Sequence, residues 1–147
     1  MSTPQQGEIW WAQAEDKRRP VLIVTRNEAV AVLRRVPGLK ERLRSATELL
    51  VPLVTLGELE YGASLATPPE RQREAVRTFM AGATLLSPTA RTAAEYGRIK
   101  ASLKAAGTPL PENDVWIAAF AAEHGLPLAT RDAHFKRVLG LSVLDWS

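Results

Sequence analysis

The chain of 147 residues contains no cysteine and only two histidines, His124 and His134. The absence of cysteine excludes disulfide bonds and thiolate metal sites, and two scattered histidines argue against a zinc site. No apolar run approaches the roughly 18 residues of a membrane-spanning helix, and residues 1–7 carry no apolar signal core. The sequence also lacks a glycine-rich phosphate loop, a serine nucleophile elbow and a dinucleotide-binding fingerprint. We therefore expect a cytoplasmic protein with no membrane association.

The overall composition is that of one ordinary globular unit. Apolar residues make up 46% and charged residues 24% of the chain, which is typical of folded proteins and leaves enough apolar surface for a core. The formal net charge is +3. This mild basic excess is compatible with a polyanionic partner such as nucleic acid, but it does not require one.

Strand-like and helix-like patterns alternate along the chain. The helical patterns cover residues 28–50 with a break at Pro37 and Gly38, and then 56–65, 68–81, 88–106, 113–124 and 133–138. This alternation predicts an α/β fold with a mostly parallel sheet of four to five strands, covered by helices on both faces. The short apolar runs that we expect as strands are 21–25, 51–55, 83–87, 126–130 and 141–144.

The first twenty residues follow a different pattern. Residues 7–14 resemble a strand, residues 15–19 a charged turn, and residues 20–24 a second strand. Because so short a connection joins antiparallel strands, we expect an N-terminal β-hairpin. We therefore divide the chain into a hairpin extension, residues 1–20, and a main α/β domain, residues 21–147, which together form one globular unit.

Three acidic residues lie where apolar runs give way to helical patterns: Glu58, Asp114 and Asp132. Ligand sites of parallel α/β sheets lie at the carboxyl ends of the strands, so these side chains are expected to converge there. Clustered carboxylates repel one another unless a cation neutralises them. A hard divalent metal with oxygen ligands fits this pattern. The chain is thus a candidate metal-dependent hydrolase.

Helix capping is an alternative explanation for each acid taken singly. Thr55 and Glu58 have the spacing of a capping box. Asp114, or Asn113 beside it, has the position of an N-cap, and Asp132 has the same position before the short helical pattern that follows it. Capping and metal binding are compatible, because a helix N-terminus stabilises a carboxylate. The repetition of acids at three similar junctions favours a shared site.

Several motifs resemble those of a known family. From about Arg34 to Trp146 the chain is similar to the PIN-domain ribonucleases, especially the VapC-like toxins of bacterial toxin–antitoxin pairs. The resemblance implies a three-layer α/β/α fold, cleavage of RNA that depends on Mg²⁺ or Mn²⁺, an antitoxin partner and a homodimer. The matching stretches are residues 51–63, 95–100, 107–119, 129–135 and 143–146.

The resemblance also implies roles for individual residues. Glu58, Asp114 and Asp132 match the second, third and fourth acids of the family's metal site, and Thr130 matches its accompanying hydroxyl. The first acid is missing, because Thr25 stands where the family has an aspartate. A threonine hydroxyl can contact Mg²⁺ but carries no charge, so we expect the exchange to reduce or abolish activity.

Three nearby residues are possible auxiliaries at the altered position. Asn27 matches the asparagine that follows the family's first acid, two residues after Thr25. Glu28 replaces the missing carboxylate if its loop bends inward. Glu112 assists near Asp114.

The N-terminal segment resembles a second family. Residues 7–11 and 18–24 are similar to the opening of the MazF/PemK-like ribonuclease toxins, and Arg19 matches a residue used in catalysis there. The rest of that fold, including its catalytic threonine or serine segment, is absent. Three hypotheses stay open: a metal-dependent endoribonuclease impaired at Thr25, an inactive degenerate toxin that dimerises and binds an antitoxin, and a metal-independent MazF-type ribonuclease.

Overall fold

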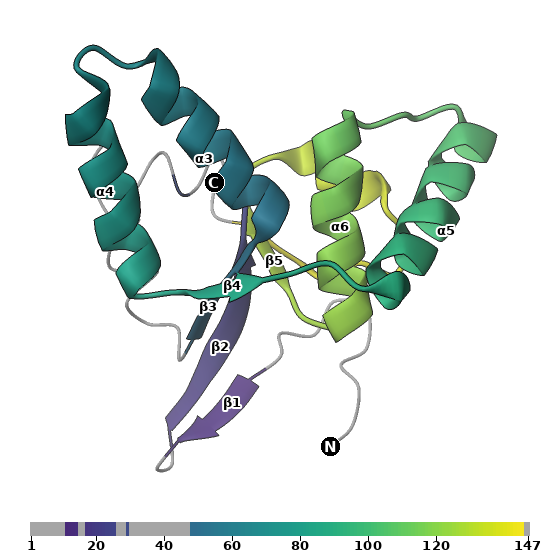
Figure 1. The fold of residues 1–147 in the computed structure, drawn as a ribbon. Helices are drawn as coiled ribbons and strands as arrows, with labels where there is room; N and C mark the ends of the chain where they lie inside the picture. Colours follow the sequence, from purple (N-terminus) through teal and green to yellow (C-terminus); the bar gives the residue numbers. More distant parts are fainter. Residues whose placement is uncertain (1–10, 15–16, 26–28, 30–47, 146–147) are drawn as a thin grey trace.

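A computed structural model of the protein describes residues 11–14, 17–25, 29 and 48–145 (Figure 1). The helical pattern expected over residues 28–50 lies almost entirely outside this described part. Its last residues, 48–50, belong to strand β3 (Glu48–Pro52), so the helix predicted there is wrong. Within it, a mostly parallel sheet carries two pairs of helices, α3 with α4 and α5 with α6. No helix in the described ranges is long and apolar enough to cross a bilayer.

The sheet has five parallel strands in the order β4-β3-β2-β5-β6, and β1 pairs antiparallel with β2. The central strand β2 therefore lies between β3 and β5, which are far apart along the chain. Short apolar runs form these strands, and the strand residues Ile23, Val51 and Leu128 are fully buried, as is typical of the inner strands of a parallel sheet. The strands are β1 (Trp11–Ala14), β2 (Lys17–Val24), β3 (Glu48–Pro52), β4 (Thr84–Leu86), β5 (Leu128–Thr130) and β6 (Val143–Asp145).

Strand β2 takes part in two kinds of pairing. Its first half, from Lys17 to Pro20, pairs with β1, and its second half pairs in parallel with β3 and β5. The boundary that we expect between residues 20 and 21 falls inside this strand. The division into an extension and a main domain stays a prediction.

The helices are connected by short loops and pack in consecutive pairs. In Figure 1 the pair α3 and α4 lies on the left and the pair α5 and α6 on the right, with the sheet below and between them, and α3 contacts α6. The helices are α3 (Leu53–Leu65), α4 (Pro69–Ala81), α5 (Ala90–Ala106), α6 (Glu112–His124) and the 3-10 helix η1 (Ala133–Arg137).

The start of α3 corrects the sequence analysis. We expected a strand to Thr55 and a helix from residue 56, but β3 ends at Pro52 and α3 begins at Leu53. Pro52 is the N-cap, with φ −60° and no side-chain cap. Proline ends the strand ladder because it has no N–H donor, and its fixed φ suits a helix start. Thr55 and Glu58 thus lie inside the helix, and the capping box proposed for them is wrong.

Three other helix ends follow the sequence signals. Thr89 caps α5 and forms a capping box with Thr92, which satisfies free N–H groups of the first turn. Gly107 and Gly125 end α5 and α6 in the left-handed conformation, with φ 69° and 61°. Glycine adopts this conformation without the steric cost that a Cβ would add.

Helix α6 forms the centre of the hydrophobic core. Its residues Val115 and Ile117–Ala121 are all buried, so the helix is apolar around most of its circumference. Ile23 of β2 and Leu128 of β5 are fully buried beneath it. This packing fixes the N-terminal turn of α6, which carries Asp114, close to the ends of the central strands.

Candidate functional site

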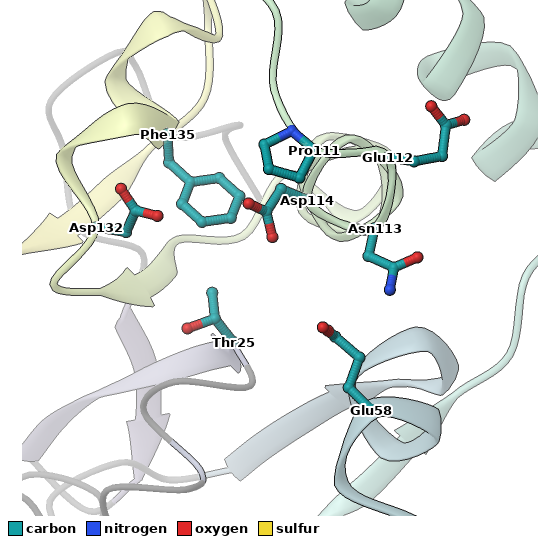
Figure 2. A pocket seen from close by; sticks show the side chains of 8 residues that line it. All are labelled: Thr25, Glu58, Pro111, Glu112, Asn113, Asp114, Asp132 and Phe135. Atoms are coloured by element: carbon teal, nitrogen blue, oxygen red, sulfur yellow. The ribbon is translucent and has the colours of Figure 1, made fainter. Parts of the chain in front are cut away.

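A pocket of about 410 Å³ opens at the carboxyl ends of the central strands (Figure 2). Thr25 directly follows β2, and Asp132 comes two residues after the end of β5. Glu58 projects from α3, which follows β3, and Asp114 lies in the first turn of α6. Glu58, Asp114 and Asp132 thus line one pocket, as the sequence pattern led us to expect. The lining residues are Thr25, Glu58, Pro111, Glu112, Asn113, Asp114, Asp132 and Phe135.

Asp114 and Asp132 interact electrostatically across this pocket. Burial raises the pKa of the Asp114 carboxyl above its ordinary value, and repulsion from Asp132 raises it further, while attraction to His134 opposes both. The Phe135 ring, which is 2% exposed, lies between the two aspartates in Figure 2 and excludes water on that side. The pair is therefore a concentration of negative charge that a cation would relieve.

Asp132 also caps η1. Its Oδ1 accepts a hydrogen bond from the backbone N–H of His134 at 2.9 Å and lies 3.0 Å from Nδ1 of the same residue. The Asp132 N–H donates in turn to Oγ1 of Thr130 at 3.0 Å. The capping expected for Asp132 is confirmed. Thr130 is buried and acts on the site by holding the backbone of Asp132.

Asp114 is not an N-cap. The cap position of α6 belongs to Pro111, and no side chain bonds to the free N–H groups there. The carboxylate of Asp114 instead faces the pocket (Figure 2). The capping explanation is therefore wrong for Asp114, and equally for its neighbour Asn113.

Thr25 contributes a polar group without a partner. The residue is 4% exposed, and among the described residues its Oγ1 has no hydrogen-bond partner. Its carbonyl oxygen accepts the N–H of Ala29 at 3.1 Å. In Figure 2 the side chain stands in the pocket, on the side of the sheet.

Of the three auxiliary residues expected near Thr25 and Asp114, the structure describes Glu112. Glu112 lines the pocket rim, but its Oε2 lies 2.8 Å from Nζ of Lys100 and its Oε1 accepts from the Tyr96 hydroxyl. Its carboxylate points away from the pocket toward α5 in Figure 2. Tyr96 stacks on Trp116 at 3.9 Å between ring centroids, so this cluster ties the start of α6 to α5. Asn27 and Glu28 lie outside the described residues.

Sequence reasoning missed three lining residues, Pro111, Asn113 and Phe135. Asn113 was considered only as a cap, yet its amide faces Glu58 across the pocket (Figure 2). Its position beside Asp114, at the exposed start of an apolar helix, was the available signal. Phe135 was one apolar residue among many, and nothing in the sequence placed its ring between two aspartates.

The oxygen donors suit a hydrated divalent cation. No three histidine or acidic side chains among the described residues lie close enough to hold one ion together. Mg²⁺ does not need such a cage, because it keeps several waters and uses one or two carboxylates. Asp114 and Asp132 supply that pair, and Glu58 lies within the same pocket on the opposite side. The donor set therefore fits Mg²⁺ or Mn²⁺ bound mainly by two aspartates.

Comparison with known proteins assigns the family. The PIN domain model matches residues 22–141. Ribonuclease VapC2 of Haemophilus influenzae is 33% identical over 131 residues, which cover 88% of each chain. The tRNA(fMet)-specific endonuclease VapC of Salmonella typhimurium is 32% identical over 110 residues, 74% of this chain and 83% of the relative. The crystal structure of DNA-bound VapBC from Salmonella typhimurium matches with a TM-score of 0.81 and 29% identity, covering 86% and 98% of the two chains.

These matches confirm the resemblance that the C-terminal motifs carry. They do not support the resemblance of residues 7–36 to MazF/PemK-like toxins, since the family match begins at residue 22 and continues through β2 into the PIN fold. The α/β architecture with parallel strands agrees with the matched solved structure. The chain therefore belongs to the PIN-domain family and, within it, to the VapC group.

Proposed function

We propose that this protein is a divalent-metal-dependent endoribonuclease, the toxin of a toxin–antitoxin pair. The observation that carries the proposal is the pair Asp114 and Asp132, held close enough to repel each other in a pocket lined by oxygen donors. Its relatives of the VapC group are named ribonucleases, one of them specific for tRNA(fMet). RNA is thus the substrate class that both the site and the family favour.

The chain's own residues divide the work of such a site. A divalent ion, when bound, would lower the pKa of a water and polarise the phosphodiester. Asp114 and Asp132 would hold the ion, with Asp132 fixed in place by His134 and Thr130. Glu58 faces them across the pocket and would orient a water molecule by accepting a hydrogen bond from it. The Asn113 amide has N–H donors for a phosphate oxygen of the RNA.

An antitoxin is the proposed protein partner. The matched solved structure from Salmonella typhimurium is a VapBC complex bound to DNA. We also propose a homodimer and a cytoplasmic location, where RNA substrates are found. The net charge of +3 is compatible with these nucleic-acid contacts.

An inactive toxin is the second candidate. Thr25 supplies no charge to the pocket, and the described residues contain no ready-made three-ligand group. Such a protein would bind its antitoxin and dimerise without cleaving RNA.

RNA cleavage by wild type, with Mn²⁺ and in a chelator, and by the variants Asp114→Asn, Thr25→Asp and Arg19→Ala tests the proposal. Wild type is expected to cleave structured RNA with Mn²⁺, to lose activity in a chelator, and to become inactive as Asp114→Asn. Inert wild type with active Thr25→Asp would support the second candidate instead. Cleavage that persists in chelator and depends on Arg19 would contradict both and favour a metal-independent mechanism.

A further inference from the structure

We infer that the Thr25 hydroxyl is a functional oxygen of the acidic pocket, retained although it costs folding stability, and that it limits the pocket to one divalent cation. The inference deepens the proposed function, on which the identity of the ligand rests. It concerns what this chain does at position 25, where the family resemblance implies an aspartate.

The first argument is the burial of an unpaired group. The Thr25 side chain is almost wholly removed from water, and its Oγ1 bonds to nothing in the described part of the chain. A buried hydroxyl without a partner destabilises the folded state. Valine has nearly the same shape, favours strands and carries no such penalty. Stability alone therefore favours valine here, and the hydroxyl needs another explanation.

The second argument is the position of that hydroxyl. Thr25 directly follows the central strand β2, which lies between β3 and β5, and lines the same pocket as Asp114 and Asp132. Figure 2 shows its side chain in the pocket, on the side of the sheet, with Asp132, Asp114 and Glu58 around it. A cation-bound water or a phosphate oxygen in the pocket would give the hydroxyl the partner that the protein does not provide.

The third argument is the charge of the pocket. The close pair Asp114 and Asp132 carries two negative charges when ionised, and one divalent cation neutralises them. Glu58 adds a third carboxylate to the same pocket, which is too little charge for a second divalent cation. A carboxylate at position 25 would be the fourth in a partly desolvated space, and a second cation would then be favoured. The neutral hydroxyl keeps an oxygen at that place without the charge. We therefore expect the pocket to bind one divalent cation.

Calorimetric titration of the full chain with Mn²⁺, together with urea unfolding in chelator, tests the inference. Thr25→Val is expected to unfold at a higher urea concentration than wild type and to bind Mn²⁺ roughly 10-fold more weakly, at the lower end of the effect of losing an indirect metal contact. Thr25→Ser keeps the hydroxyl and is expected to bind as wild type does. Thr25→Asp is expected to bind two Mn²⁺ per chain where wild type binds one.

A matched control separates the pocket from burial in general. Thr92 is fully buried like Thr25, but its hydroxyl donates to Glu123, outside the pocket. Thr92→Val is therefore expected to lower stability and to leave Mn²⁺ binding unchanged.

Two results would overturn the inference. One is unchanged Mn²⁺ affinity in Thr25→Val, and the other is lower stability or failure to fold of that variant in chelator. Asp114→Asn distinguishes this failure from that of the proposed function. If Asp114→Asn binds Mn²⁺ as wild type does, the metal site itself is wrong. If it loses binding while Thr25→Val keeps it, only the role of Thr25 is wrong.

Discussion

Replacing Glu123 by glutamine should destabilise the protein by about 2 kcal/mol at neutral pH. Glu123 lies at the end of α6, with a side chain only 5% exposed. Its two oxygens accept hydrogen bonds from the hydroxyls of Thr89, at 2.6 Å, and Thr92. Glutamine has one acceptor oxygen, so one threonine loses its acceptor. A hydrogen bond to a charged group contributes about 1.5–3 kcal/mol, and burial protects this one from screening by water.

The stability lost in Glu123→Gln should depend on pH. Burial alone would raise the pKa of Glu123, but the hydrogen bonds from Thr89 and Thr92, with the charges of His124 and Arg91, hold it below its ordinary value of 4.5. A lowered pKa in the folded state means that the unfolded state binds more protons in this range. The stability from Glu123 is therefore present above pH 4.5 and is lost as the pH falls through the folded value.

Urea unfolding of wild type and Glu123→Gln at a series of pH values from 7 to 3 provides the measurement. The control is Glu74→Gln, because Glu74 pairs with Arg77 on the surface of α4, where both side chains are about two-thirds exposed, 69% and 68%. That change should cost at most about 0.5 kcal/mol. Equal effects of the two substitutions at pH 7, or a Glu123 effect that does not shrink in acid, would refute the reasoning.

Three further predictions concern other elements. Asp114→Asn should raise the free energy of unfolding of the metal-free protein at pH 7, and urea melts should show this gain disappearing toward pH 3.8, the ordinary pKa of an aspartate. The reason is that the pKa of Asp114 is raised in the folded state, so its contribution to stability is complete below pH 3.8 and is lost as the pH rises. Gly107→Ala should lower stability by about 1 kcal/mol, because Gly107 has a φ of 69°. Gly97→Ala, inside α5 and with equal space for a Cβ, should raise stability by about 0.5–1 kcal/mol. Thermal melts that rank the two variants otherwise would contradict this prediction. Lys100→Met should cost less than about 1 kcal/mol in a urea melt, because its ion pair with Glu112 is half exposed, at 53% and 54%.

The parts of the fold that follow from local chemistry could be predicted from the sequence. Apolar runs located the parallel strands, and the glycines at 107 and 125 located two helix ends, because a left-handed residue has few other solutions. The start of α3 was misplaced by three residues. There the apolar run continues past Pro52 into the helix, and periodicity alone cannot divide the two.

The candidate site was predictable only where it depends on topology. Strand ends of a parallel sheet meet at one edge, which brings Glu58 and Asp132 together whatever their neighbours are. The orientation of Glu112 depends instead on Lys100, twelve residues earlier on another helix. Such pairings across helices leave no trace in the local pattern, and the same is true of the Asn113 amide facing Glu58.

The two oxygens of Asp132 have unequal duties, and this affects how genetic data on the protein should be read. Oδ1 is occupied by His134 at the start of η1, which leaves Oδ2 for a ligand. A substitution that removes both oxygens disturbs the cap of η1 and ligand binding together. A mutational scan will therefore score position 132 as intolerant without revealing which of the two was lost. Asp114 caps nothing, and intolerance there would report on chemistry alone.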